Sequence, residues 1–192
     1  MDLAHDVGYP ALFGLVMAES GGAPVPGETA LIAAGALAGR GHLEIAVVIM
    51  LAASAAIIGD NIGYLIGRHG GRRLLTRPGR FAGQRAKVLE YGEPFFARHG
   101  PKAVFFGRWI LGLRVWASWL AGITRMPWRS FLLFNALGGI SWAVTVGVLA
   151  YLAGDAIDVV IRAFGIGALV VIALVAGGAL VLHRRRRRSI VG

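Results

Sequence analysis

Three long apolar stretches constrain the fold of this chain more than any other feature. Residues 45–67 contain one charged residue in 23 positions, and residues 130–154 and 163–182 contain none in 25 and 20 positions. A helix of about 20 apolar residues crosses a hydrocarbon core of about 30 Å. Helices also satisfy their own backbone hydrogen bonds in lipid. We therefore expect an all-α membrane protein with spans at about 45–67, 130–154 and 161–183.

An apolar stretch near the N-terminus is harder to assign. Residues 7–18 are short for a span, and Asp2 and Asp6 precede them where a secretory signal would carry positive charge. The sequence leaves open whether this stretch crosses the membrane, tilts within it or lies at its interface.

Two other apolar stretches are broken. Residues 29–39 follow Pro24, Pro26 and Gly27 and offer only eleven apolar or small positions. Residues 103–124 contain two arginines, each of which costs about 2.5–3.5 kcal/mol at the centre of a spanning helix. Such segments suit re-entrant hairpins, whose irregular backbone is surrounded by protein or water. We expect these hairpins at about 20–40 and 103–124.

The positive charges predict the orientation. The connection from Arg68 to Lys102 carries nine basic residues, and the tail at 184–192 carries Arg184 to Arg188. Basic segments near spans stay in the cytoplasm, so we expect both on that side. Attraction of basic residues to anionic lipid accounts for the net charge of +10 without nucleic acid.

The broken segments belong to an internal repeat. In each of two units, a charged residue and a glycine-containing turn lead to a short apolar segment with an Ala-Gly pair, and a span follows. The pairs are Ala34-Gly35 and Ala121-Gly122. One crossing separates the units, so they enter the membrane from opposite faces. We expect an inverted-topology repeat of two hairpins, each followed by a span, in a membrane domain covering residues 1–160.

Four ionisable residues on the broken segments form the candidate site. Glu19 and Glu28 flank the first turn, and Arg108 and Arg114 flank the second. Charges at membrane depth are costly unless they are paired or face a wet cavity, so they indicate function. Guanidinium groups suit phosphate, and a carboxylate can exchange protons. The alternative is that the four residues only neutralise each other and hold the hairpins together.

Several classes of function lack their residues. The chain has no cysteine, and its five histidines have no ligand spacing, so we expect no metal site and no cofactor. It contains no hydrolase or phosphate-loop motif. We therefore expect no enzyme activity, with a membrane lipid-phosphate phosphatase as the enzymatic alternative.

These motifs resemble those of the DedA family, also called SNARE-associated or VTT-domain membrane proteins. The first signature runs from Glu19 to Glu28 and continues to Ala34-Gly35. The second comprises Gly107-Arg108-Trp109, Gly112-Leu113-Arg114 and Ala121-Gly122. The resemblance covers about residues 8–155. It implies two opposed re-entrant hairpins and translocation of lipids across the bilayer, with undecaprenyl phosphate or phospholipids as substrates and proton or sodium coupling in some members.

The resemblance assigns functional roles to the same four charged residues. Glu19 and Glu28 correspond to the family's acidic pair, and Arg108 and Arg114 to its essential arginines. The chain departs from the family pattern at Leu111 and near Ser118, where the family has proline. Gly112 could still permit the break, although a straighter second hairpin becomes an alternative.

Further residues support this site. Asp60, Tyr64 and Arg68 share one helical face. An interhelical hydrogen bond from Asp60, with Arg68 snorkelling to the cytoplasmic interface, is the alternative to a role in coupling. Asn135 and Trp142 share another face with two glycines, for which we favour helix packing over chemistry.

The sequence thus predicts a multi-pass protein of the bacterial cytoplasmic membrane with a cytoplasmic C-terminus. We expect it to move an anionic lipid phosphate, most readily undecaprenyl phosphate, between leaflets, with protons or sodium ions as coupling partners. A phospholipid scramblase and a non-transporting membrane-homeostasis factor are the alternatives. Homo-oligomerisation is left open.

Overall fold

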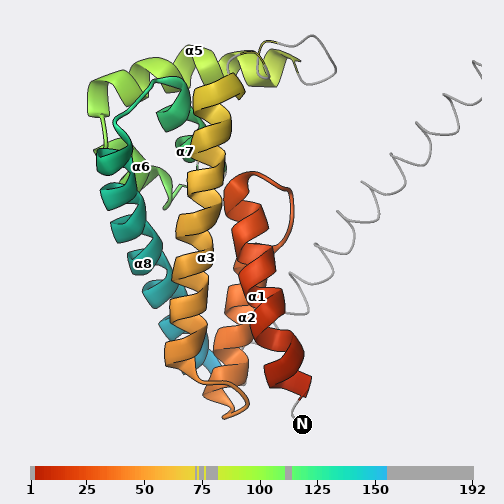
Figure 1. The fold of residues 1–192 in the computed structure, drawn as a ribbon. Coiled ribbons are helices and arrows are strands. Elements are labelled where there is room, and N and C mark those ends of the chain that lie inside the picture. Colours follow the sequence, from red (N-terminus) through yellow and green to blue (C-terminus); the bar gives the residue numbers. More distant parts are fainter. Residues whose placement is uncertain (1–2, 72, 74–75, 77–81, 111–113, 155–192) are drawn as a thin grey trace, which may run out of the picture. The chain divides into compact units, whose positions relative to one another are not determined.

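A computed structural model of the chain describes residues 3–71, 73, 76, 82–110 and 114–154. The chain divides into two units, residues 1–154 and 155–192. The predicted span at 161–183 and the basic tail at 184–192 lie outside the described residues. Every regular element of the described part is helical (Figure 1): α1 (Leu3–Gly21), α2 (Gly27–Gly39), α3 (Ile45–Ile66), the π-helical turn η1 (Gly67–Gly71), α5 (Ala82–His99), α6 (Lys102–Gly107), α7 (Arg114–Ile123) and α8 (Trp128–Ala153).

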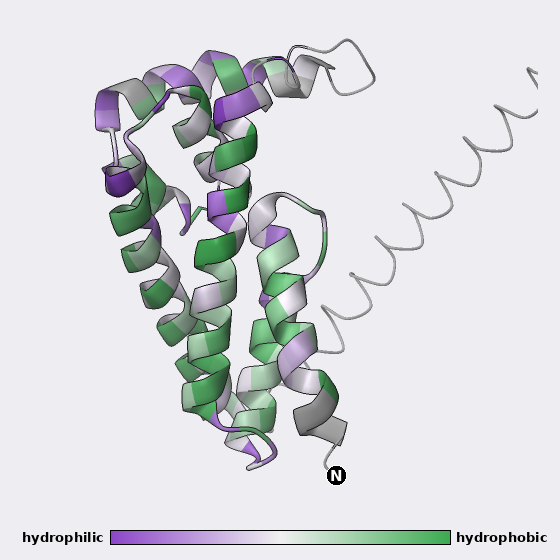
Figure 2. Cartoon of the chain, in the orientation of Figure 1, coloured by the Kyte–Doolittle hydropathy of each residue, from purple (hydrophilic) through white to green (hydrophobic). Residues whose placement is uncertain are grey.

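Two of these helices are long and apolar enough to cross a membrane. They are Ile45–Gly71, which joins α3 and η1 over 27 residues, and Trp128–Ala153, which is α8 with 26 residues. Large apolar side chains such as Met50 and Leu152 remain exposed on them, at 61% and 72% of their surface. Figure 2 shows the hydrophobic colouring along both helices. The prediction of an all-helical chain with apolar helices at these two places is confirmed.

Both broken stretches are interrupted near the predicted positions. The turn at residues 22–26 separates α1 from α2, and α2 begins directly after Pro26. Gly22 has a φ of 111°, a conformation that glycine adopts without steric cost. Residues 7–18 lie within α1, so the first hairpin has an arm that begins at Leu3. In the second internal repeat, α6 ends at Gly107 and α7 begins at Arg114. Leu111 and Gly112, where a straighter hairpin was the alternative, lie outside the described residues.

Two internal repeats within residues 1–154, α1 to α3 and α6 to α8, pack on each other reciprocally. The first arm of each hairpin packs on the long helix of its own repeat, α1 on α3 and α6 on α8. The second arm packs on the long helix of the other repeat, α2 on α8 and α7 on α3. A Cβ atom on Gly35 would lie 2.7 Å from the Cβ of Ala150, and one on Gly122 would lie 2.1 Å from the carbonyl oxygen of Tyr64. Both glycines of the repeated Ala-Gly pairs thus permit a close helix contact.

A buried cluster fixes the η1 end of α3. Tyr64 stacks on Phe131 with ring centroids 4.5 Å apart, and its hydroxyl donates to the carbonyl oxygen of Met126 at 2.6 Å. Arg68 donates from Nη1 to that hydroxyl at 2.8 Å. α3 is thereby tied to the turn between α7 and α8. In Figure 1, α5 lies near this end, and it packs on α6 and α7.

Candidate functional site

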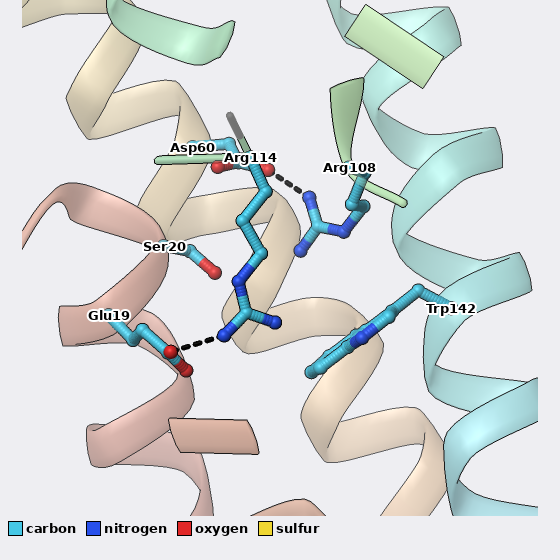
Figure 3. Close-up of a pocket in the computed structure, with 6 residues that line it drawn as sticks. All are labelled: Glu19, Ser20, Asp60, Arg108, Arg114 and Trp142. Carbon is cyan, nitrogen blue, oxygen red and sulfur yellow. Dashed lines mark hydrogen bonds and ion pairs between the residues drawn. The ribbon is translucent and has the colours of Figure 1, made fainter. Parts of the chain in front are cut away.

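The two hairpin turns meet partway along the long helices. At the first turn, a Cβ atom on Gly21 would lie 3.6 Å from the carbonyl oxygen of Gly59, which is in the body of α3. At the second turn, Arg108 follows α6 and reaches the adjacent Asp60 of α3. The side chains of the two turns thus converge between α3 and α8, away from the ends of both helices (Figure 3).

Arg114 connects the second hairpin to the first. Its Nη2 is paired with Oε1 of Glu19, and its Nη1 lies 3.0 Å from Oε2 of Glu28. The side chains of Arg114 and Glu19 are each 18% exposed. One guanidinium group therefore bridges the two acidic residues of the candidate site.

Glu19 also stabilises the start of α2. Its Oε2 accepts a hydrogen bond from the backbone N–H of Glu28 at 2.8 Å. The first N–H groups of a helix have no partner within that helix, so this carboxylate acts as a cap supplied by α1. Gly27 makes the approach feasible, because a Cβ atom there would lie 2.5 Å from Oε2 of Glu19. Pro24 and Pro26 lie in the connecting turn.

Arg108 has a different set of partners. Its Nη1 is paired with Oδ2 of Asp60, and both side chains are less than 10% exposed. The same Nη1 donates to Oδ1 of Asn135 at 3.3 Å, and Nδ2 of Asn135 donates to the carbonyl oxygen of Ile57 at 3.3 Å. Among the described residues, Nε of Arg108 is buried with no hydrogen-bond partner. A buried donor of this kind is available to an incoming acceptor.

Trp142 of α8 contacts both arginines. Its ring centroid lies 5.4 Å from Cζ of Arg108 and 5.8 Å from Cζ of Arg114, within the range of cation–π attraction. Figure 3 shows its indole pointing toward the two guanidinium groups. These side chains line a small pocket, together with Glu19, Ser20 and Asp60.

The pairing of Arg108 corrects one interpretation of the sequence. One alternative was that Glu19 and Glu28 neutralise both arginines, but Arg108 pairs with Asp60 and only Arg114 pairs with the glutamates. The physical reason is the position of α6, which packs on α8 and ends where the side chain of Arg108 reaches Asp60. The sequence could have indicated that Asp60 has an ionic partner, because Asp60 is the single charge in residues 45–67 and needs a partner at membrane depth.

The supporting residues divide into two groups. Asn135 and Trp142 contact Arg108, so the interpretation of their helix face as packing alone is incomplete. Tyr64 and Arg68 bond to each other and to Met126, outside the set of residues that line the pocket. Ser20, which lines the pocket, is a residue that the sequence analysis missed.

The site has more acidic than basic groups. The carboxylates of Glu19, Glu28 and Asp60 face the guanidinium groups of Arg108 and Arg114, which gives a formal charge of −1 when all are ionised. Within the described ranges, no group of three or more His, Asp or Glu residues is arranged to hold a metal ion. The guanidinium groups can bind an anion, with the carboxylates as competing anions.

Comparison with known proteins agrees with these features. The VTT domain family matches residues 25–152. An uncharacterized membrane protein of Mycobacterium tuberculosis is 40% identical over 190 residues, which cover 95% of this chain and 86% of that protein. One from Synechocystis is 40% identical over 158 residues, with coverages of 82% and 72%.

A named relative is similar over much of its length. Protein DedA of Escherichia coli is 30% identical over 151 residues, which cover 76% of this chain and 68% of that protein. No solved structure matches the chain. The family match over residues 25–152, the relatives of 30–40% identity and the two apolar helices of spanning length show that the chain belongs to the DedA family of VTT-domain membrane proteins.

Proposed function

We propose that this protein moves an anionic lipid phosphate, most readily undecaprenyl phosphate, between the leaflets of the bacterial cytoplasmic membrane. One observation carries the proposal: two arginines from one hairpin are held by carboxylates between the two apolar helices. Guanidinium groups bind phosphate through several directed hydrogen bonds. Placing an arginine at membrane depth costs a large free energy, and binding of an anionic substrate explains why the arginine is there.

In the proposed cycle, the phosphate replaces the carboxylates. In the empty site, Asp60 neutralises Arg108, and Glu19 and Glu28 neutralise Arg114. An entering phosphate accepts hydrogen bonds from both arginines while the hydrocarbon tail stays in lipid. The carboxylates that are released take up protons, which lowers the cost of leaving them unpaired. Proton coupling follows from this exchange, and sodium ions are the alternative counter-ion.

The opposed hairpins supply a route to both faces. The turns lie beside the middle of α3 and α8. The second arm of each hairpin packs on the long helix of the other internal repeat. If both hairpins are re-entrant, small movements of either one open the pocket to a different side, as in transporters built from inverted repeats. We propose this topology with a cytoplasmic C-terminus.

Phospholipid scrambling is the second transport function to compare. A phospholipid carries a phosphodiester with one negative charge, which the same arginines can bind. Preference for a phosphate monoester follows from the presence of two arginines with separate carboxylate partners. A protein that only maintains membrane organisation would need neither arginine for transport.

Transport in proteoliposomes tests the proposal. The purified protein is reconstituted with labelled undecaprenyl phosphate or labelled phosphatidylethanolamine, and appearance of label in the opposite leaflet is followed. We expect undecaprenyl phosphate to move faster than in empty liposomes and faster than phosphatidylethanolamine. Glu28→Gln should stop this movement while the protein still folds. Equal rates for protein-containing and empty liposomes would refute the carrier function.

A further inference from the structure

The indole of Trp142 is a partner that the two arginines share. Arg108 and Arg114 have separate carboxylates on three different helices, whereas both lie within 6 Å of this one ring centroid. Trp142 itself is 5% exposed and belongs to the core between α1, α2, α3 and α8. The ring is therefore a fixed element of the pocket.

A shared aromatic ring has a property that the carboxylates lack. The π face of an indole attracts cations electrostatically. It does so without accepting hydrogen bonds from the guanidinium N–H groups, which remain available to an anion. Trp142 can thus hold both arginines while a phosphate binds to them, whereas Glu19 and Asp60 compete with that phosphate.

The two arginines need a group that holds them together because their positive charges repel each other. When the carboxylates leave Arg108 and Arg114, two positive side chains stay close together in a site of low polarity, and they repel each other. A phosphate between them compensates this repulsion only if both guanidinium groups keep their places. Long arginine side chains otherwise gain rotamer freedom by separating.

The face of α8 restrains Arg108 in addition. A Cβ atom on Gly138 would lie 3.5 Å from Cδ of Arg108, and one on Gly139 would lie 3.9 Å from its Cζ. Asn135, on the same face, accepts a hydrogen bond from Nη1. Two turns of α8 therefore line the side chain of Arg108 up to the indole of Trp142.

We propose that Trp142 is a positioning residue, which keeps the guanidinium groups of Arg108 and Arg114 together so that both bind one phosphate group. This inference rests on the proposed function and specifies how the site recognises the phosphate. Trp142 acts on the phosphate through the arginines and has no contact with the lipid tail.

Binding of two phosphate compounds to the purified full chain tests this role. Inorganic phosphate and farnesyl phosphate are titrated by calorimetry against the wild type, Trp142→Leu, Trp142→Phe and the control Trp128→Leu. Trp128 is on the same helix, is 50% exposed and donates to Asn61, away from the pocket. We expect Trp142→Leu to raise the Kd for both compounds about tenfold, Trp142→Phe about threefold and Trp128→Leu less than about twofold.

Each outcome decides a specific point. An unchanged Kd in Trp142→Leu refutes the positioning role, and so does a change confined to farnesyl phosphate, because the ring would then contact the chain. If Trp142→Leu does not fold, Trp142→Phe decides, and wild-type affinity in that variant refutes the role. Transport by the wild type with any of these results leaves the proposed function standing, whereas absence of wild-type transport refutes that function.

Discussion

Burying the charged side chain of Asp60 costs free energy, a cost that its uncharged neighbours on α3 do not have. Its side chain is 7% exposed, and it is paired with Arg108, whose side chain is 9% exposed. Moving two charges out of water is expensive, and their attraction repays this only when both partners are present. Each member of the pair therefore stabilises the fold by compensating the other.

Removal of one partner should destabilise the protein. Asp60→Asn keeps the shape of the side chain and leaves Arg108 buried without an ionic partner, a change that costs about 3–5 kcal/mol in buried pairs. We expect a clearly lower midpoint of thermal unfolding in detergent, measured by circular dichroism. Glu44→Gln, at an exposed position before α3, is the matched control. Equal midpoints for the two variants would contradict the ion pair.

The charge of the pocket predicts how its carboxylates affect phosphate binding. Glu19, Glu28 and Asp60 come from α1, α2 and α3, the two arginines adjoin α6 and α7, and α8 adds uncharged Asn135 and Trp142. Removal of one carboxylate makes the formal charge less negative, so affinity for phosphate should rise.

This effect is measured by titrating farnesyl phosphate against the wild type and Glu19→Gln. In Glu19→Gln, one competing charge is absent, so the affinity for farnesyl phosphate should be higher than in the wild type. An affinity equal to or below that of the wild type would contradict the competition between carboxylates and phosphate.

The helices meet at glycines where backbones approach closely. Gly122 of α7 faces the carbonyl oxygen of Tyr64 and the backbone nitrogen of Arg68, and Gly35 of α2 faces Ala150 and Gly147 of α8. Small residues at helix contacts are the usual means by which membrane helices pack tightly. These contacts hold the second arm of each hairpin against the opposite long helix.

Substitution of Gly122 tests the contact between α7 and α3. In Gly122→Ala, the new Cβ would lie 2.1 Å from backbone oxygen, so the helices must separate, at a cost of about 1–3 kcal/mol or more. In Gly14→Ala, the new Cβ in α1 would have no described atom within 4 Å outside the adjacent residues and the nearby backbone of its own helix. Alanine also favours a helix over glycine by about 1 kcal/mol. We expect a lower unfolding midpoint for the first variant and an equal or higher one for the second. The reverse order would contradict this packing.

The sequence predicted the positions of the helices better than it predicted the partners of the charged side chains. Apolar length located α3 and α8, and the prolines located the start of α2, because both signals are local along the chain. The sequence placed Arg114 and Glu19 on opposed turns, without assigning them to each other. The pairing of Arg108 with Asp60 was not predicted, because it depends on how far α6 extends along α8 before the chain turns. Trp142 was assigned to packing for the same reason, since its neighbours come from a hairpin more than 25 residues away in sequence.

We propose that the distribution of charge determines the orientation of the chain in the membrane. Basic residues gather in the connection after α3, and few lie before it. By the positive-inside rule, the η1 end of α3 would face the cytoplasm and its N-terminal end the opposite side. The hairpin of α1 and α2 would open toward the outer face, and that of α6 and α7 toward the cytoplasm.

Chemical labelling tests this orientation directly. The chain has no cysteine, so single cysteines can be introduced without removing any others. His42 precedes α3 and His69 lies in η1, and both are exposed. We expect a membrane-impermeant maleimide to label His42→Cys in intact spheroplasts and His69→Cys only after permeabilisation. Labelling of both in intact spheroplasts would show that α3 and η1 do not separate the two sides.

We propose that the paired arginines between the hairpins carry a lipid phosphate across the membrane. The most direct measurement is the rate at which labelled undecaprenyl phosphate changes leaflet in proteoliposomes containing the wild type, Arg108→Ala or Arg129→Ala. Arg129 lies on α8 with an exposed side chain and is the matched control. We predict that Arg108→Ala, folded by circular dichroism, falls to the rate of empty liposomes, while Arg129→Ala stays within about twofold of the wild type. A folded Arg108→Ala protein that transports as fast as the wild type would contradict the claim.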